Sequence, residues 1–132
     1  MTSWKWLTRE AVEIIYEEQL SEHGGLAGIK DENALEAALA RPQNKAASGD
    51  PNIFELAAAC LFGIVRNHPF VDGNKRTGYL VAYAFLRIHG VELNANDGEV
   101  IELVLGVAAG EIDEAGTAAF FKDYTVAAPI SA

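Results

Sequence analysis

The chain has 132 residues, of which 50% are hydrophobic and 22% are charged, and its formal net charge is −9 with a pI near 4.7. Length and composition predict one folded domain over residues 1–132, and the acidic balance argues against direct nucleic-acid binding, which needs a basic face. The longest apolar run, residues 56–65, is too short to span a membrane, no secretory signal is visible, and the single Cys60 fits a reducing compartment, so we expect a cytoplasmic protein.

Capping residues and apolar periodicity predict about six helices along the chain. We expect helices at 9–22, 32–41, 53–67, 74–89, 97–109 and 113–124. Thr8, Asp31 and Asn52 are the expected N-caps of the first three. The second helix is expected to stop before Pro42, because the residue before a proline disfavours the helical conformation, and this leaves 43–51 as a polar loop. No segment is predicted to form a sheet.

The third and fourth predicted helices are apolar nearly all round, which predicts that both are buried at the centre of the fold. The expected fold class is therefore all-α, a compact single-domain bundle of about six helices, with a candidate functional loop, residues 68–73, between these two. Residues 56–91 carry four basic side chains and one acidic one, a net charge of +3, whereas the rest of the chain carries −12. A locally cationic loop between two apolar helices suggests a site for an anion.

The loop and the start of the fourth helix read HPFVDGNKRT, from His68 to Thr77. Lys75 and Arg76 fall in the first turn of a helix, where free N–H groups and the macrodipole disfavour each cation by about 0.3–1 kcal/mol. A bound phosphate would make these two cations favourable at this position, because helix N-termini bind anions. The pattern therefore predicts a phosphate site at this turn.

This stretch resembles the core motif of the Fic/Doc family. The broad Fic pattern, H-P-F-x-[DE]-G-N-G-R-x-x-R, is followed from His68 to Asn74, after which Lys75 replaces a glycine and Tyr79 replaces the last arginine. The pattern of the Doc (death-on-curing) branch, H-x-F-x-D-x-N-K-R-T, is matched at every fixed position. Weaker similarity to Doc toxins covers residues 24–26, 35–42 and 106–112.

The resemblance implies a nucleotide site with defined roles. His68 is the candidate general base, because an imidazole can accept a proton at neutral pH; otherwise it is an ordinary polar loop residue. Asp72 is the candidate ligand of an Mg²⁺ ion that bridges nucleotide phosphates; the simpler interpretation is a helix cap or turn residue. The candidate phosphate-binding residues are Gly73, Asn74, Lys75 and Arg76. The simpler interpretation of Asn74 and Arg76 is helix-start polarity and a surface ion pair, and that of Gly73 is a turn residue.

Lys75 determines which part of the nucleotide is transferred. In Fic proteins the glycine at this position leaves room for the β- and γ-phosphates, and AMP is transferred. The resemblance to Doc implies that the lysine fills that room, so that the nucleotide binds turned round and the γ-phosphate is transferred. Tyr79 agrees with this orientation, because it cannot hold a distal phosphate as a cation would.

The expected protein is a Doc-type toxin of a bacterial toxin–antitoxin pair, a protein kinase that uses ATP with Mg²⁺. The resemblance implies elongation factor Tu, modified on a threonine, as the target, and inhibited translation as the result. It also implies a separately encoded antitoxin whose C-terminal segment folds onto the toxin, and the inhibitory motif [ST]-x-x-x-E-[GN] of self-restrained Fic proteins does not occur in the sequence. Fic-type AMP transfer to a protein hydroxyl is one alternative, and a non-catalytic protein-binding module is another.

Overall fold

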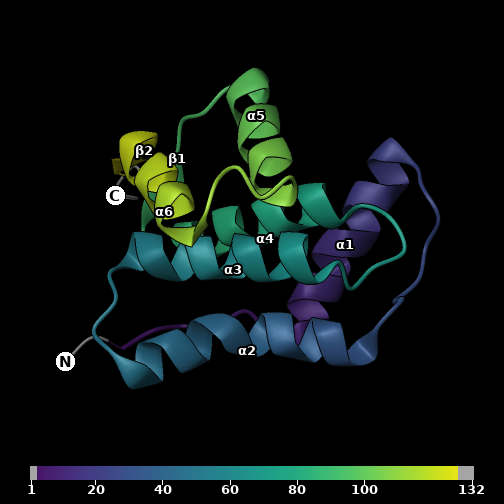
Figure 1. Ribbon diagram of the computed structural model, residues 1–132, viewed down its shortest axis with the longest axis horizontal. Coiled ribbons are helices and arrows are strands. Elements are labelled where there is room, and N and C mark those ends of the chain that lie inside the picture. Colours follow the sequence, from purple (N-terminus) through teal and green to yellow (C-terminus); the bar gives the residue numbers. More distant parts are fainter. Residues whose placement is uncertain (1–2, 128–132) are drawn as a thin grey trace, which may run out of the picture.

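The computed structural model describes residues 3–127, which form six helices and one small sheet (Figure 1). In chain order the elements are α1 (Arg9–His23), α2 (Glu32–Ser48), α3 (Ile53–Asn67), α4 (Asn74–Ile88), β1 (Val91–Leu93), α5 (Asp97–Ala108), α6 (Glu114–Asp123) and β2 (Thr125–Ala127). The predicted all-α class and its six helices are confirmed. The ends of the predicted domain, 1–2 and 128–132, lie outside the described residues. None of the helices in the described chain has the length and apolar character needed to cross a membrane.

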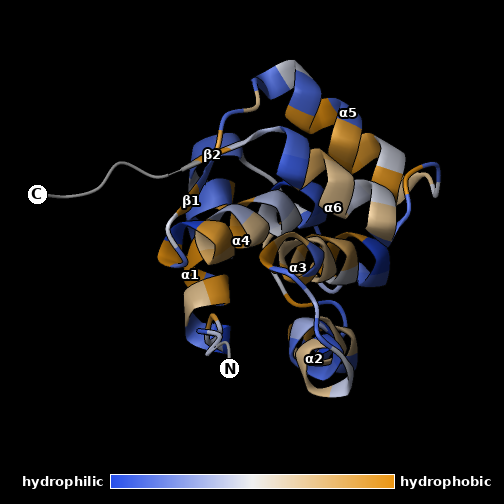
Figure 2. Cartoon of the chain, turned by 90° about the vertical axis from the view of Figure 1, so that its left-hand side faces the viewer, coloured by the Kyte–Doolittle hydropathy of each residue, from blue (hydrophilic) through white to orange (hydrophobic). Residues whose placement is uncertain are grey.

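Helix α3 forms the centre of the fold, as its composition predicts. Nine of its 15 residues are buried, and α2, α4 and α6 pack around it. Figure 2 shows α3 nearly end-on, with α2 below it, α6 above it and α4 to its left. Two glycines permit this packing. A Cβ added at Gly63 would lie 3.2 Å from the backbone of Ala38 on α2, and one added at Gly78 on α4 would lie 2.8 Å from the side chain of Val65.

The prediction that the second helix stops before Pro42 is wrong, because α2 continues to Ser48. Pro42 is buried, and burial of its ring offsets part of the cost, about 3 kcal/mol, of a proline inside a helix. The extra turns also carry Lys45, whose Nζ donates to Glu114 Oε2 at 2.5 Å, beside Arg41, whose Nε donates to Glu114 Oε1 at 2.7 Å. Contacts with α6 therefore stabilise a segment that local signals assigned to a loop.

A short antiparallel sheet joins the segment after α4 to the end of the described chain. Strand β1 pairs with β2 in the register Val91↔Ala127, Glu92↔Val126 and Leu93↔Thr125. The prediction that no segment forms a sheet is wrong at this point. The two strands are separated in sequence by α5 and α6, so no local pattern reveals their pairing.

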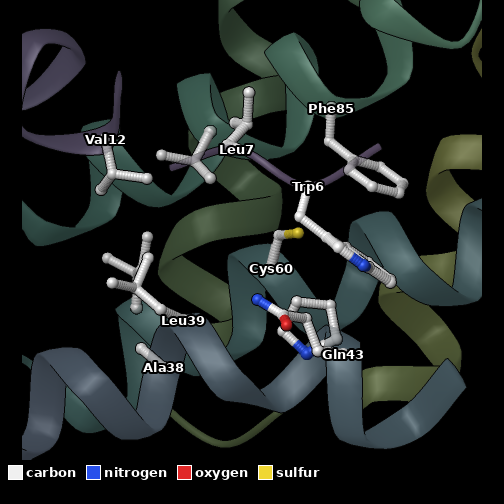
Figure 3. Close-up of a pocket in the computed structure, with 11 residues that line it drawn as sticks. Trp6, Leu7, Val12, Ala38, Leu39, Gln43, Cys60 and Phe85 are labelled. Carbon is white, nitrogen blue, oxygen red and sulfur yellow. The ribbon is translucent and has the colours of Figure 1, made fainter. Parts of the chain in front are cut away.

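The thiol of Cys60 lies in the core beside a cavity of about 20 Å³ (Figure 3). Trp6, Leu39 and Phe85 are among the side chains that surround this space, which has room for about one water molecule. The cavity is therefore a packing gap and too small for a ligand. Burial raises the pKa of Cys60 to about 12, so its thiol stays protonated at neutral pH and does not act as a nucleophile.

Candidate active site

His68 is positioned by the end of α3, where it is the C-cap residue. Its backbone is left-handed, with φ 53° and ψ 53°, and its N–H donates to the carbonyl oxygen of Ile64 at 3.0 Å. Among residues 3–127 it is the one non-glycine residue with a positive φ, a conformation in which histidine is enriched several-fold. The imidazole is exposed. The candidate base is therefore held by a rigid helix while its side chain remains accessible.

The loop that follows is anchored by Phe70 and Asn74. Phe70 is fully buried and stacks on Tyr16 of α1, with ring centroids 4.0 Å apart and an interplanar angle of 9°. The side chain of Asn74, which is 3% exposed, accepts a hydrogen bond from the Phe70 N–H and donates one to the Phe70 carbonyl oxygen, both at 2.9 Å. Because both polar groups of this side chain are engaged, the phosphate contact expected of Asn74 is left to its backbone N–H.

A second segment, residues 26–31, runs along the loop and is bonded to it. The Lys30 N–H donates to the Pro69 carbonyl oxygen at 2.8 Å, and the Val71 N–H donates to the Gly28 carbonyl oxygen at 2.9 Å. Sequence analysis did not predict this pairing, because the two segments are remote along the chain. The available signal was the pair Gly24 and Gly25 just before the segment and Gly28 within it, because glycine allows two backbones to approach closely.

Asp72 does not cap α4. Its Oδ2 accepts a hydrogen bond from the Leu26 N–H at 2.8 Å, and the N-cap of α4 is Gly73, with φ 82° and no side-chain capping bond. The interpretation of Asp72 as a helix cap is therefore wrong. Its carboxylate is exposed and is positioned from outside the helix by the 26–31 segment.

The N-terminus of α4 differs from those of the other helices in the described chain. Each of the other five has a side-chain N-cap and an acidic residue in its first turn, whereas α4 has neither. Lys75 and Arg76 stand there instead, and neither forms a salt bridge within residues 3–127. Arg66, by contrast, donates to two carbonyl oxygens at the end of α5, and Arg87 is paired with an acid of β1. Uncompensated positive charge is thus concentrated at this turn, where the helix dipole adds to it.

The structure brings all six predicted site residues to one pocket of about 550 Å³. The polar part of its lining consists of these six together with four others: His68, Asp72, Gly73, Asn74, Lys75 and Arg76, with Glu22, His23, Tyr79 and Asp97. The apolar part comes mainly from α4 and α5: Leu80, Val100, Ile101, Val104 and Leu105. One ligand with a charged end and an apolar end can therefore be bound here, as in most small-molecule sites.

Tyr79 lines the same pocket and is half-buried. Burial raises the pKa of Tyr79 to about 12, helped by the negative charge that Tyr83 and Asp97 can carry. Its hydroxyl is therefore uncharged at neutral pH and can donate a hydrogen bond but supplies no positive charge.

Gln19 is a neighbour of the loop that sequence analysis missed. It is 2% exposed, and a Cβ added at Gly73 would lie 2.1 Å from its Nε2, so the close approach of the loop to α1 requires glycine. Gln19 Nε2 has no hydrogen-bond partner among the described residues. The available signal was its spacing from Val12 and Tyr16, which places all three on the inward face of α1.

Asp72 is a suitable but incomplete ligand for Mg²⁺. Within the described part of the chain, no group of three or more His, Cys, Asp or Glu side chains could hold a metal ion. Mg²⁺ is commonly bound by one or two carboxylates together with substrate phosphates and water. The site therefore fits an ion that arrives with a nucleotide, and Asp72 is the residue that would hold it.

We predict that Asn74→Ala lowers the free energy of unfolding by about 2–4 kcal/mol, because each buried polar group left without a partner costs about 1–3 kcal/mol. Urea denaturation measures this change. Asn44→Ala, at an exposed position of α2, is the matched control and should change stability by less than about 0.5 kcal/mol. Equal stability of the two variants would contradict the anchoring role of Asn74.

Comparison with known proteins agrees with the geometry of this site. The model of the Fic/DOC family matches residues 6–86, more than half of the chain. The chain is similar to "Protein kinase doc" of Escherichia phage P1, with 34% identity over 113 residues that cover 85% of this chain and 89% of the relative. It is also similar to "Toxin Doc" of Mycolicibacterium smegmatis, with 45% identity over 75 residues, although this match spans 58% of the relative's length. The chain therefore belongs to the Fic/DOC family, on its Doc-type side.

Proposed function

We propose that this protein is a Doc-type toxin that transfers the γ-phosphate of ATP to a hydroxyl group of a target protein. One observation carries the proposal: the uncapped N-terminus of α4, with Lys75 and Arg76, lines the same pocket as His68 and Asp72. Such a site can bind phosphates and place a base beside them. The similarity to a relative named as a protein kinase supports the same reaction.

In the proposed reaction the target hydroxyl attacks the γ-phosphorus, the bond from that phosphorus to the β–γ bridging oxygen breaks, and ADP leaves. A ring nitrogen of His68 accepts the hydroxyl proton. Lys75, Arg76 and the backbone N–H groups that follow Gly73 hold the phosphates and offset their negative charge, which is the main contribution of a protein to phosphoryl transfer. Mg²⁺, held by Asp72 and the phosphates, would supply further charge neutralisation.

Lys75 supports transfer of phosphate over transfer of AMP. Its side chain stands where Fic proteins have a glycine, and Tyr79 stands where they have an arginine. Because a tyrosine side chain carries no positive charge in either protonation state, the position that would hold a distal phosphate in the Fic orientation has no cation. Both substitutions favour an ATP molecule whose γ-phosphate lies nearest His68.

We propose elongation factor Tu, on a threonine hydroxyl, as the target, with inhibited translation in the cytoplasm as the effect. The partner we propose is an antitoxin whose C-terminal segment binds the groove between α1, the 26–31 segment and the start of α2. This groove, of about 490 Å³, has Tyr16, Leu20 and Ile29 in its lining, together with three glutamates, of which Glu17 and Glu32 are exposed. Such a lining fits a helix with apolar anchors and basic residues.

We predict that ATP labelled in its γ-phosphate, and not in its α-phosphate, transfers label to a protein target, because Lys75 occupies the space that AMP transfer requires. Autoradiography of the target after incubation with each nucleotide tests this. Lys75→Gly should shift the balance toward α-label, although the absence of an arginine at position 79 keeps that activity low. Label arriving from the α position alone in the parent protein would favour Fic-type AMP transfer.

We predict that His68→Ala lowers phosphate transfer by about 10²–10⁴-fold, equivalent to about 3–5 kcal/mol of activation free energy, because no base then accepts the hydroxyl proton. His68→Asn should lose as much activity while retaining stability, since asparagine tolerates the left-handed conformation. Transfer rates and circular dichroism measure the two effects. Cys60→Ala, in the core, is the control that keeps its activity. An active His68→Asn enzyme would remove the proposed base.

We predict that expression of this protein alone stops bacterial growth and that co-expression of the adjacent short reading frame restores it, because the sequence lacks the inhibitory motif of self-restrained Fic proteins. Glu17→Lys should weaken the rescue but not the toxicity, since it reverses a charge on the proposed antitoxin groove. Growth curves measure both effects. Normal growth of cells that contain soluble, folded protein would contradict the toxin proposal. Full rescue of the Glu17→Lys variant would contradict the proposal that the antitoxin binds this groove.

A further inference from the structure

The imidazole of His68 contacts a lysine outside the sequence motif. Lys30 Nζ lies 3.0 Å from His68 Nδ1. A lysine ammonium has three donors and no acceptor, so Nδ1 must be the acceptor and the proton of the neutral ring must be on Nε2. In this arrangement neither ring nitrogen is free to accept a proton, because Nδ1 is occupied and Nε2 is already protonated.

The backbone of Lys30 is held in place beside the loop, whereas the end of its side chain is free to move. The N–H groups of Lys30 and Asp31 both donate to the carbonyl oxygen of Pro69, at 2.8 and 3.1 Å, and Ile29 forms a bridge with Phe70. The Cα of Lys30 is therefore held beside the residue that follows His68. Its side chain is exposed, and a lysine side chain loses rotamer entropy when it is held in one position, so a stronger anionic partner can draw the ammonium away.

We propose that Lys30 is a positioning residue that keeps His68 in a non-accepting state until ATP binds. The phosphates of the nucleotide, bound at the start of α4, attract the Lys30 ammonium away from Nδ1 and leave that nitrogen free to take the hydroxyl proton. The proposal rests on the proposed function, in which His68 is the base. The contact between Lys30 and His68 would allow His68 to accept the hydroxyl proton only when ATP is bound.

His89 provides an internal reference for the test. Its Nδ1 lies 2.8 Å from the Phe85 carbonyl oxygen and its Nε2 accepts from the Lys5 N–H at 3.0 Å. Because a carbonyl oxygen only accepts, the proton of the neutral His89 ring is on Nδ1, the opposite tautomer to that of His68. Long-range ¹H–¹⁵N spectra distinguish the two tautomers, and the His68→Asn spectrum assigns the His68 signals by their loss.

We expect these spectra, recorded about two pH units above the ordinary histidine pKa of about 6.5, to show a hydrogen-bonded Nδ1 in His68 of the parent protein. Lys30→Met should shift this signal and leave that of His89 in place. Addition of Mg²⁺ with the non-hydrolysable analogue AMP-PNP should move the parent signal to the position seen in Lys30→Met. Lys122→Met, at an exposed position of α6, is the matched control and should change neither histidine.

Identical His68 signals in the parent and Lys30→Met proteins would overturn the contact. The amide signals of Gly73 and Asn74 report nucleotide binding. If they shift while the His68 signal does not, the proposal that the nucleotide draws Lys30 away from His68 would be overturned. A large loss of phosphate transfer by Lys30→Met at saturating ATP would also overturn the proposal, because Lys30 would then act in the loaded enzyme and not before ATP binds. An active His68→Asn enzyme would instead remove the proposed base and leave the Lys30 contact measurable by itself.

Discussion

The paired hydrogen bonds between the Asn74 side chain and the Phe70 backbone are the constraint on which the site depends. They tie the first residue of α4 to a loop residue that is itself buried against Tyr16. With Phe70 fixed, the chain before it must leave α3 at His68, and the chain after it must enter α4 through Gly73. Hydrogen bonds in a buried setting are stronger than in water, so a single side chain defines the geometry of both ends of the loop.

The site separates the groups that hold it from the groups that carry charge. Its anchors, Phe70 and Asn74, are uncharged and buried, whereas Asp72, Lys75 and Arg76 are exposed. Burying an ion without a partner costs several kcal/mol, and this arrangement avoids that cost while it keeps the charges directed at a pocket. The local repulsion of two cations at a helix N-terminus is then the smaller cost, about 0.3–1 kcal/mol each, and a bound anion would remove it.

The features that could be predicted from the sequence are those that depend on residues close together along the chain. Apolar periodicity located α3 and α4, and the motif identified six residues that share one pocket. The errors involve partners that are distant along the chain. Pro42 continues in a helix because of contacts with α6, and Asp72 is engaged by the Leu26 N–H although its position before Gly73 suggested a cap. Lys30 and Gln19 were missed for the same reason, since no local pattern connects either residue to the loop.

The central position of α3 has a consequence for the motions of the site. Amide hydrogens exchange with solvent either through local opening or through unfolding of the whole domain. Because α3 is packed against α2, α4 and α6, its buried amides should exchange mainly when the domain unfolds. His68 ends this helix, whereas the 26–31 segment beside it is held mainly by hydrogen bonds at the surface. Slow exchange on one side of the loop that follows His68, and fast exchange on the other, would identify the 26–31 segment as the part that can open in the native protein.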